Sequence, residues 1–153
     1  MSAVPEPIVQ YGHVEPTFVH FDDLDSMGIV HNSRYAVMLE RALTNFWEQH
    51  GYSHSGGKPS HPDAFVAVVE YSIGYKVPVF GTGEILIHFW GDRIGKTSAT
   101  YGFRVLSTDG KTVHAEGRRV HIRLDQESLT PTPWAAETLA IYETILPPEG
   151  SAA

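Results

Sequence analysis

The fold of this chain is decided by one stretch, residues 19–51: VHFDDLDSMGIVHNSRYAVMLERALTNFWEQHG. A short strand, predicted at Thr17–Phe21, leads into it and is stopped by a group of acidic residues. Gly28 accepts a positive φ at low steric cost, so the backbone can turn back sharply before the next element begins. Asp25 lies within this turn. The sequence therefore places a carboxylate just before the N-terminus of a helix.

The helix that follows is predicted from Ser33 to His50, with Asn32 or Ser33 as its N-cap and Gly51 just beyond its end. At 1.5 Å per residue it would be about 27 Å long, enough to cross a small domain. Apolar residues occupy most of its surface and leave only a narrow polar stripe: Arg41, Thr44, Asn45 and Glu48. Such a wide apolar surface predicts a helix that is enclosed on several sides.

Length and composition predict a single cytoplasmic domain. The 153 residues suit one core, expected at about residues 14–146, with a mobile arm at 1–7 and a tail at 147–153. The absence of cysteine excludes disulfides and a thiol nucleophile. Neither a signal peptide nor a membrane-spanning segment is recognisable. A net charge of −7 argues against nucleic acid and anionic membranes as main partners.

After the helix, the sequence predicts a loop, four strands and a second helix. The loop, Gly51–Asp63, is interpreted as a lid or rim. Alternating β-branched and aromatic residues predict antiparallel strands, joined as hairpins in a meander, at residues 64–75, 84–90, 98–107 and 112–124. The final helix, Pro133–Ile145, has Thr132 as its expected cap and packs on an edge of the domain. This order predicts an α+β domain of the hotdog type, in which one curved antiparallel sheet wraps around one long central helix.

A sheet of this size cannot cover a helix that is apolar on nearly every side. Leu39, Leu43 and Phe46, together with the edges of the flanking strands, are expected to leave apolar surface uncovered. The sequence therefore predicts self-association, as a homodimer or a homotetramer.

The run Phe21–Tyr35, FDDLDSMGIVHNSRY, resembles the D-x-D-x-x-G-x-V-x-N-x-x-Y signature of the 4-hydroxybenzoyl-CoA thioesterase and YbgC-like acyl-CoA thioesterases. Leu39–Ala42 resembles the E-R-A segment in the helix of that family, and Pro78–Glu84 resembles its turn before a strand. The resemblance extends from about Val14 to about Leu146 and is most specific in its first third. It implies a hotdog fold, thioester hydrolysis without a cofactor, and dimers or dimers of dimers with active sites at the subunit interface.

Carried over by position, the resemblance assigns the catalytic carboxylate to Asp25. Asn32 matches a position that lies by the thioester carbonyl in relatives, and Tyr35 matches an aromatic residue of the first helical turn. His31 lies next to the position where some relatives have a histidine. The expected oxyanion and substrate-binding set is Gly28, Val30, His31, Asn32, Ser33 and Tyr35. The cations that could bind coenzyme A phosphates are Arg93, Lys96, Arg118 and Arg119.

Thioester hydrolysis needs a nucleophile or a base, together with hydrogen-bond donors for the developing oxyanion. It needs little acid assistance, because a thiol with a pKa near 8.5 gives a good leaving group. Asp25 could attack the carbonyl directly or deprotonate water. Backbone N–H groups around Asn32 and Ser33 could donate to the oxyanion, helped by the helix dipole. The substrate would be a thioester of coenzyme A or of an acyl carrier protein.

Several of these residues also have a purely structural explanation. Asp is common in turns, so Asp25 could have no chemical role, and Asn32 could be only a helix cap. His31 is interpreted as a turn or interface residue rather than as a base. Glu40 is interpreted as a structural acid paired with a nearby arginine, although some hotdog enzymes place their working carboxylate inside the helix.

Two other functions remain open at this stage. One is a hydratase or dehydratase acting on acyl thioesters, which would need a histidine and an acid over the acyl chain. The other is a non-catalytic module that binds an acyl ligand. The remaining acids of the turn, Asp22 and Asp23, are interpreted as structural or solvated. The histidine spacing matches no metal-binding pattern, so no metal is expected.

Overall fold

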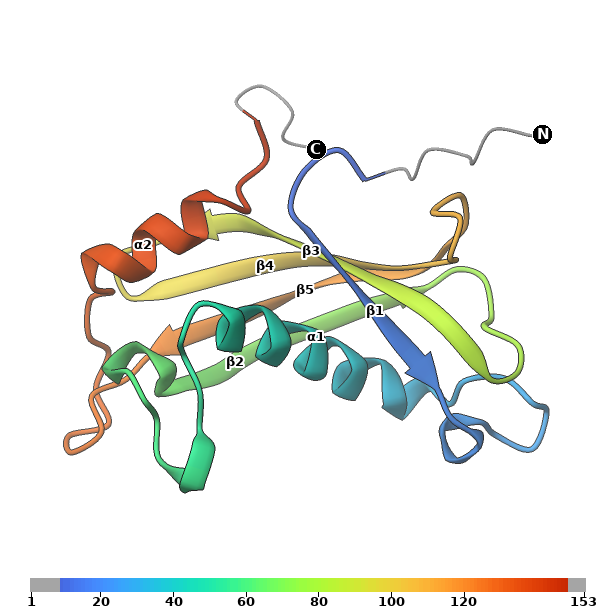
Figure 1. Ribbon diagram of the computed structural model, residues 1–153, viewed down its shortest axis with the longest axis horizontal. Coiled ribbons are helices and arrows are strands. Elements are labelled where there is room, and N and C mark those ends of the chain that lie inside the picture. Colours follow the sequence, from blue (N-terminus) through green and yellow to red (C-terminus); the bar gives the residue numbers. More distant parts are fainter. Residues whose placement is uncertain (1–8, 149–153) are drawn as a thin grey trace.

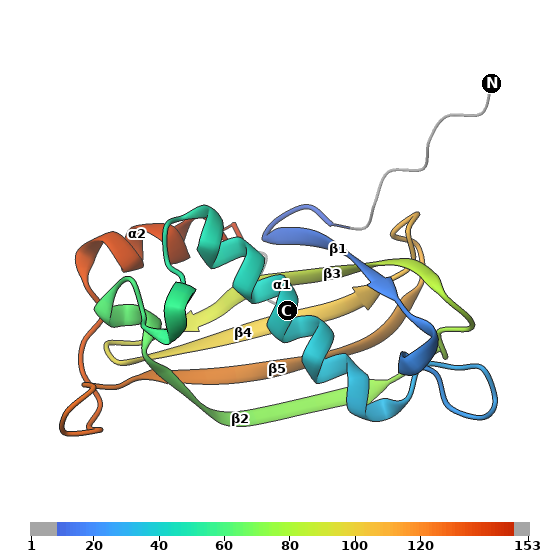
Figure 2. The ribbon, with the colours of Figure 1, turned by 60° about the horizontal axis from the view of Figure 1, so that its bottom comes forward.

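The computed structural model describes residues 9–148, in which one long helix crosses one face of a five-stranded sheet (Figures 1 and 2). The helices are α1 (Tyr35–Gln49) and α2 (Ala136–Glu143). The strands are β1 (His13–Val19), β2 (Val66–Tyr75), β3 (Gly83–Ile94), β4 (Ser98–Leu106) and β5 (Val113–Arg123). The predicted α+β architecture is confirmed. The expected N-terminal arm and most of the tail lie outside the described residues.

The sheet is antiparallel throughout, in the order β1-β3-β4-β5-β2. Hairpins join β3 to β4 and β4 to β5, as predicted. The expected meander is wrong for β2, which pairs with β5 and not with β3. The reason is that β1 occupies the edge of β3, from His13 opposite Phe89 to Val19 opposite Gly83. Residues 76–82 therefore connect two strands that are not neighbours, and β2 is left as an edge strand.

Strand β1 begins and ends earlier than the predicted Thr17–Phe21. Val19 is fully buried, but Phe21 lies in a 3₁₀ turn, Phe21–Asp23, and its side chain is 85% exposed. The turn forms because the Asp23 carboxylate accepts a hydrogen bond of 2.8 Å from the His20 N–H, which ends the strand before Phe21 can pair.

Strand β3 continues beyond residue 90, where the predicted strand ended, and extends to Ile94. A β-bulge between Gly91 and Arg93 accommodates one extra residue in β3, so that the pairing with β4 continues to Ile94. The actual turn follows at Gly95, whose N–H donates to the Ser98 carbonyl.

Helix α1 packs on the sheet with one face only. Its buried side chains are Tyr35, Met38, Leu39, Ala42, Leu43 and Phe46, and its opposite face is polar and exposed. The prediction of a helix enclosed on several sides is therefore wrong, and so is the expectation that Leu39, Leu43 and Phe46 leave uncovered surface. The uncovered apolar side chains lie instead on the edge strand β2: Val66, Val68, Val69, Tyr71 and Tyr75.

Neither helix is capped as predicted. A 3₁₀ turn, Asn32–Arg34, precedes α1, and its cap is the His31 side chain, whose Nδ1 accepts from the Ser33 N–H at 3.1 Å. Helix α2 begins at Ala136, three residues after the expected Pro133. The Thr132 cap is replaced by the Asp63 carboxylate, which accepts from the Ala135 N–H at 2.7 Å.

The loop after α1 is held to the rest of the domain by buried Asp63. Its carboxylate lies 2.8 Å from Arg123 Nε and accepts a hydrogen bond from the Thr138 hydroxyl at 2.5 Å. Two 3₁₀ turns shape this loop, Ser55–Gly57 and Pro62–Ala64. In residues 9–148, no helix combines the length and the apolar character that crossing a membrane requires.

Candidate functional site

The turn that carries Asp25 has a fixed backbone. The Asp25 N–H donates to the Ile29 carbonyl at 2.8 Å, and the Gly28 N–H donates to the Asp25 carbonyl at 3.0 Å. Gly28 has φ +78°, which confirms the positive φ expected for the turn. The Asp25 side chain accepts through Oδ1 alone, from the N–H groups of Met27 at 2.8 Å and Ile29 at 3.3 Å. Among the described residues, Oδ2 has no hydrogen-bond partner and is open to a reactant.

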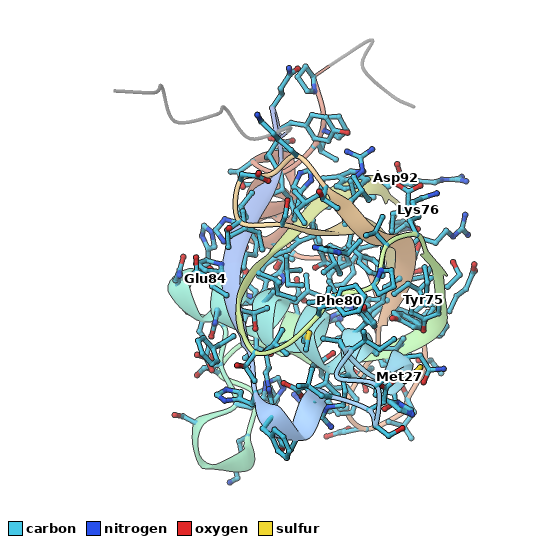
Figure 3. The ribbon with its side chains drawn as sticks, turned by 90° about the vertical axis from the view of Figure 1, so that its right-hand side faces the viewer. Met27, Tyr75, Lys76, Phe80, Glu84 and Asp92 are labelled. Carbon is cyan, nitrogen blue, oxygen red and sulfur yellow. The ribbon has the colours of Figure 1, made fainter. Side chains whose placement is uncertain are left out.

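A surface cavity of about 430 Å³ lies beside this carboxylate. It is lined by the turn and the helix start on one side, and by the last residue of β2 and the segment that follows it on the other. The lining residues are Asp25, Ile29, Val30, His31, Asn32, Tyr35, Tyr75, Lys76, Val77 and Pro78. Figure 3 shows Met27, Tyr75, Lys76 and Phe80 at this end of the molecule. Met27 and Phe80 are exposed apolar side chains that do not line the cavity.

Two backbone contacts hold the Asp25 turn against the segment that follows β2. The Val30 N–H donates to the Val79 carbonyl at 3.0 Å, and the Gly81 N–H donates to the Gly28 carbonyl at 2.9 Å. The Tyr75 hydroxyl adds a third link, because it donates to the Asn32 carbonyl at 3.2 Å. The two walls of the cavity are thus joined, although they lie more than 40 residues apart in the sequence.

The helix start offers one unused donor to the cavity. The Ser33 N–H is occupied by His31 Nδ1, and Ser33 is not among the residues that line the cavity. The Asn32 N–H, the first of the 3₁₀ turn, makes no hydrogen bond within residues 9–148. Tyr35 forms the inner wall, where burial raises the pKa of its hydroxyl, so the group stays protonated at neutral pH.

Asp23, the first acid of the signature, is structural, as predicted. It is buried, and its Oδ1 accepts from Arg34 Nε at 2.8 Å. Burial alone would raise the pKa of Asp23, but the His20 N–H and the Arg34 guanidinium together outweigh it and hold the pKa below its usual value of 3.8. The pair joins the end of β1 to the helix start and so fixes both ends of the Asp25 turn.

The predicted phosphate-binding cations lie away from this cavity. Arg119 is buried and paired with Glu40 of α1, which confirms the structural assignment of Glu40. Arg118 pairs with Glu70 on the edge strand at 3.0 Å. Arg93 and Lys96 are exposed near the β3–β4 turn.

The second wall of the cavity, which contains Tyr75 and Lys76, was not predicted from the sequence. Lys76 Nζ lies 3.3 Å from Glu116 and leaves half of its side chain exposed. No local pattern singles out these residues, because their position depends on the pairing of β2 with β5 across 40 residues of chain.

The sequence of this chain matches a family of known proteins. Residues 19–141 match the model of the thioesterase-like superfamily. No curated protein sequence matches this chain significantly.

Solved structures with the same fold include three that cover most of the chain. The PA5185 protein from Pseudomonas aeruginosa strain PAO1 is 26% identical, with a TM-score of 0.76, and the match covers 90% of this chain and 93% of that one. A DHNA-CoA thioesterase from Staphylococcus aureus has 15% identity, a TM-score of 0.71 and coverage of 87% and 89%. A 1,4-dihydroxy-2-naphthoyl-CoA thioesterase from Synechocystis has 15% identity, a TM-score of 0.74 and coverage of 84% and 93%. These matches confirm the hotdog fold.

Proposed function

We propose that this chain, which belongs to the thioesterase-like superfamily, hydrolyses acyl thioesters of coenzyme A with Asp25 as its working carboxylate. The observation that carries the proposal is the hydrogen bonding of the Asp25 side chain. Oδ1 is held by two backbone N–H groups, while Oδ2 is free at the wall of a cavity next to a helix start. A carboxylate fixed in this way is positioned to react without first giving up a partner.

The chemistry can be written with groups that line the cavity. Oδ2 adds to the thioester carbonyl carbon, or it removes a proton from a water molecule that does so. The carbonyl oxygen gains negative charge, which the free N–H of Asn32 and the positive end of the α1 dipole stabilise. The C–S bond then breaks, and the thiolate leaves and takes up a proton from solvent. In the first route, water hydrolyses the acyl-aspartate anhydride and regenerates the carboxylate.

Ser33 and His31 have other roles in this proposal. His31 Nδ1 accepts from the Ser33 N–H and lies 2.8 Å from the Ser33 hydroxyl, so the imidazole stabilises the helix start. The oxyanion donor is therefore assigned to Asn32. Val30 and Tyr35 shape the inner wall, and Gly28 gives the turn its backbone conformation.

Lys76 is the cation that we assign to the phosphates of coenzyme A. It lines the cavity and is half-exposed, whereas Arg119 is buried in an ion pair. Arg118, on β5, is paired with Glu70 and does not line the cavity. Arg93 and Lys96 are not included in this assignment, because neither lines the cavity.

We further propose that the chain forms a homodimer through β2. This edge strand presents unpaired backbone groups together with five exposed apolar side chains, a combination that favours pairing with a second strand. A two-fold axis near the middle of β2 would join the two sheets into one antiparallel sheet. Sedimentation of the wild type and of Val69→Lys tests this contact; a wild type that is monomeric at micromolar concentration would refute it.

The experiment that tests the activity is the release of free thiol from a panel of acyl-CoA thioesters. Asp25→Asn should lower kcat by about 10² or more and leave the melting temperature unchanged, because Oδ1 can still accept from Met27 and Ile29. Asp22→Asn is the matched control, since Asp22 is an exposed acid three residues away. Wild-type turnover by a folded Asp25→Asn protein would refute the assignment.

A further inference from the structure

His88 is buried on the face of the sheet that lies opposite α1. Its neighbours along β3, Ile87 and Phe89, belong to the hydrophobic core, so the alternation of the strand directs His88 and Trp90 to the other face. A histidine on such an outer face is normally exposed, but His88 exposes only 1% of its surface. Its cover is the segment that precedes β1, residues 9–12, which we call the strap.

Side-chain contacts hold the strap against β3. His88 Nε2 lies 2.8 Å from the Tyr11 carbonyl oxygen, and because a carbonyl can only accept, Nε2 carries the proton of the neutral imidazole. The Tyr11 ring lies against the His88 ring and edge-on to Trp90, with centroid distances of 5.8 and 5.7 Å. Within residues 9–148, no backbone–backbone hydrogen bond involves the strap. The position of the strap therefore depends on the side chains of His88 and Trp90.

The strap can approach β3 this closely because residue 12 is glycine. Gly12 has φ +78°, and a Cβ added there would collide with the Phe89 carbonyl oxygen and would lie 3.1 Å from His88 Nε2. A larger residue at position 12 would therefore push the strap away from the strand. The imidazole is shielded from solvent only while the strap lies against it.

The second imidazole nitrogen of His88, Nδ1, is buried and makes no hydrogen bond within residues 9–148. A proton added to the ring must bind at Nδ1, where it would be a buried donor without an acceptor. Burial lowers the pKa of His88 below its usual value of 6.5, and Arg104 lowers it further, while the hydrogen bond to the Tyr11 carbonyl has the opposite effect. The neutral imidazole is therefore the form that fits beneath the strap.

Arg104 is the charged residue that faces His88 from β4, where the two residues are partners in register. Its Nε lies 3.5 Å from Glu116 on β5, so the carboxylate that is next along this row already has a cation beside it. A second positive charge on His88 would be repelled by Arg104, and Glu116 lies one strand too far away to compensate.

Strand β1 and the strap supply no counter-charge to His88 either. The residue of β1 opposite His88 is Val14, which is apolar. The flanking His13 and Glu15 pair with each other at 2.9 Å, and the His13 ring packs against Phe89 on the core side of the sheet. Within the described part of the strap, the titratable group is the Tyr11 phenol, which is neutral below pH 8. Closure of the strap over a charged His88 is therefore unfavourable.

We propose that the strap is a pH-sensitive cover, closed while His88 is neutral and opened when His88 binds a proton at Nδ1. Opening lets water reach Nδ1 and uncovers the surfaces of His88 and Trp90 that Tyr11 contacts. Because the open form binds the proton more tightly, the ratio of open to closed strap should rise about tenfold for each pH unit below 6.5, until the pKa of the closed form is reached. The device lies on the face of the sheet opposite α1, so it does not depend on the proposed hydrolase activity.

The strap can be followed with a single fluorophore, because the chain has no cysteine. In Gln10→Cys, at an exposed position of the strap, a bimane label should be quenched by the Trp90 indole while the strap is closed. Its fluorescence should rise as the pH is lowered from 7.5 to 4.5, with the midpoint at which NMR shows His88 becoming protonated. The far-UV circular dichroism should stay that of the folded protein.

Three outcomes of this titration would overturn the inference. The first is fluorescence that stays constant over the whole pH range. The second is a rise that occurs only together with the loss of the circular dichroism signal, because the whole domain would then be unfolding. The third is a label that is no dimmer at pH 7.5 than in the additional Trp90→Phe variant, because the strap would then not be closed at neutral pH.

Two further variants separate His88 from the other titrating groups. His88→Gln keeps an N–H donor for the Tyr11 carbonyl but cannot titrate, so the label should stay quenched at pH 4.5. Gly12→Ala should be bright at every pH and should return the pKa of His88 toward 6.5, because its Cβ prevents closure. The matched control is Gly56→Ala, at a glycine of φ +74° with open space around it in the loop after α1, and it should titrate as the wild type does. A wild-type response in His88→Gln, or wild-type fluorescence and His88 pKa in Gly12→Ala, would overturn the inference.

Discussion

Two aspartates that lie near opposite ends of α1 differ in how fully their carboxylate oxygens are hydrogen-bonded. At the N-terminal end, Asp25 is held by two backbone N–H groups and keeps one oxygen free beside a cavity. At the C-terminal end, Asp63 is buried and uses both oxygens, on Arg123, Ala135 and Thr138. A carboxylate with one oxygen free of hydrogen bonds can react, whereas a carboxylate with both oxygens hydrogen-bonded can only stabilise the fold. Side chains of the same chemistry thus divide into reactive and structural ones according to their unused hydrogen-bonding capacity.

If Asp63 is the structural aspartate of the two, Asp63→Asn should cause a large loss of stability. The substitution keeps the shape of the side chain but leaves Arg123 buried without its counter-charge, which should lower the free energy of unfolding by about 3–5 kcal/mol. The loop after α1 and the start of α2 lose their common anchor at the same time. Urea denaturation is the measurement.

The control for Asp63→Asn is Asp92→Asn, which changes an exposed aspartate on β3 and should shift stability by less than about 0.5 kcal/mol. A folded Asp63→Asn protein with wild-type stability would show that Asp63 is no more structural than Asp25.

The next prediction concerns the backbone of the turn that carries Asp25. Gly28 has φ +78°, and a Cβ added there would meet no atom within 4 Å, so Gly28→Ala introduces backbone strain without a clash. The expected cost is about 1–2 kcal/mol in the free energy of unfolding. Since the strain falls on the turn that orients Asp25, kcat should fall by more than the loss of folded protein explains. Chemical denaturation and thiol release on the same preparation separate the two effects.

The control for Gly28→Ala is Gly57→Ala, at another glycine of positive φ with open space around it, in the loop far from Asp25. It should cost similar stability and leave kcat unchanged. Equal loss of kcat in both variants would show that the turn does not position the carboxylate.

The two ends of α1 also differ in how well sequence predicts them. The acidic turn, Gly28, the helix and the place of Asp25 before that helix follow from residues that are close in the sequence, so local rules identify them. The second wall, with Tyr75 and Lys76, depends on the pairing of β2 with β5. A hairpin to β3 was the simplest expectation for β2, and nothing in its sequence shows that β1 already occupies that edge.

A second pocket, of about 310 Å³, lies between the C-terminal half of α1, the start of β2 and α2. Its aromatic wall consists of Trp47, Tyr52, Tyr101, Trp134 and Tyr142. This aromatic pocket was not predicted for the same reason. Its lining comes from α1, the long loop, β2, β4, β5 and the region of α2, and each of these residues alone fits an ordinary core or surface position. The prediction of the cap before α1 was wrong for a more local reason. Asn32 and Ser33 are better caps by residue type than His31, but the imidazole reaches the Ser33 N–H because the strand-like backbone of His31 points it there.

A third prediction concerns the buried His121, near the C-terminal half of α1, and the dependence of stability on pH. Burial and then Arg119 lower the pKa of His121 from 6.5 to about 3. Between these values the unfolded chain binds a proton that the folded chain does not, so this contribution to stability is complete above pH 6.5 and is lost as the pH falls. The slope for one such group is about 1.4 kcal/mol per pH unit. Burial of His88 lowers its pKa in the same direction and adds to the slope.

The measurement is the free energy of unfolding of wild type and His121→Gln between pH 6.5 and 5. The variant should lose stability less steeply, by about 1.4 kcal/mol per pH unit. His54→Gln, at an exposed position of the loop, should keep the wild-type slope. Equal slopes in all three proteins would mean that His121 is not held neutral in the wall of the aromatic pocket.

The smallest effect concerns the link between the two walls of the Asp25 cavity. The Tyr75 hydroxyl donates to the Asn32 carbonyl at 3.2 Å, and its ring lies against Tyr35 with a centroid distance of 5.4 Å. Tyr75→Phe keeps the ring contact and removes only the hydrogen bond, which should cost about 0.5–1 kcal/mol or less at this exposed position. Because Asn32 supplies the proposed oxyanion donor, kcat should fall a few-fold while KM stays nearly constant.

Tyr71→Phe is the matched control for this change, because Tyr71 lies on the same strand, stacks on Phe103, and makes no hydrogen bond through its hydroxyl within residues 9–148. It should leave kcat unchanged. If both variants lower kcat equally, the effect belongs to β2 as a whole and not to the Tyr75 hydroxyl. If Tyr75→Phe raises KM instead, the hydroxyl contacts the substrate directly, and Asn32 does not depend on it for its position.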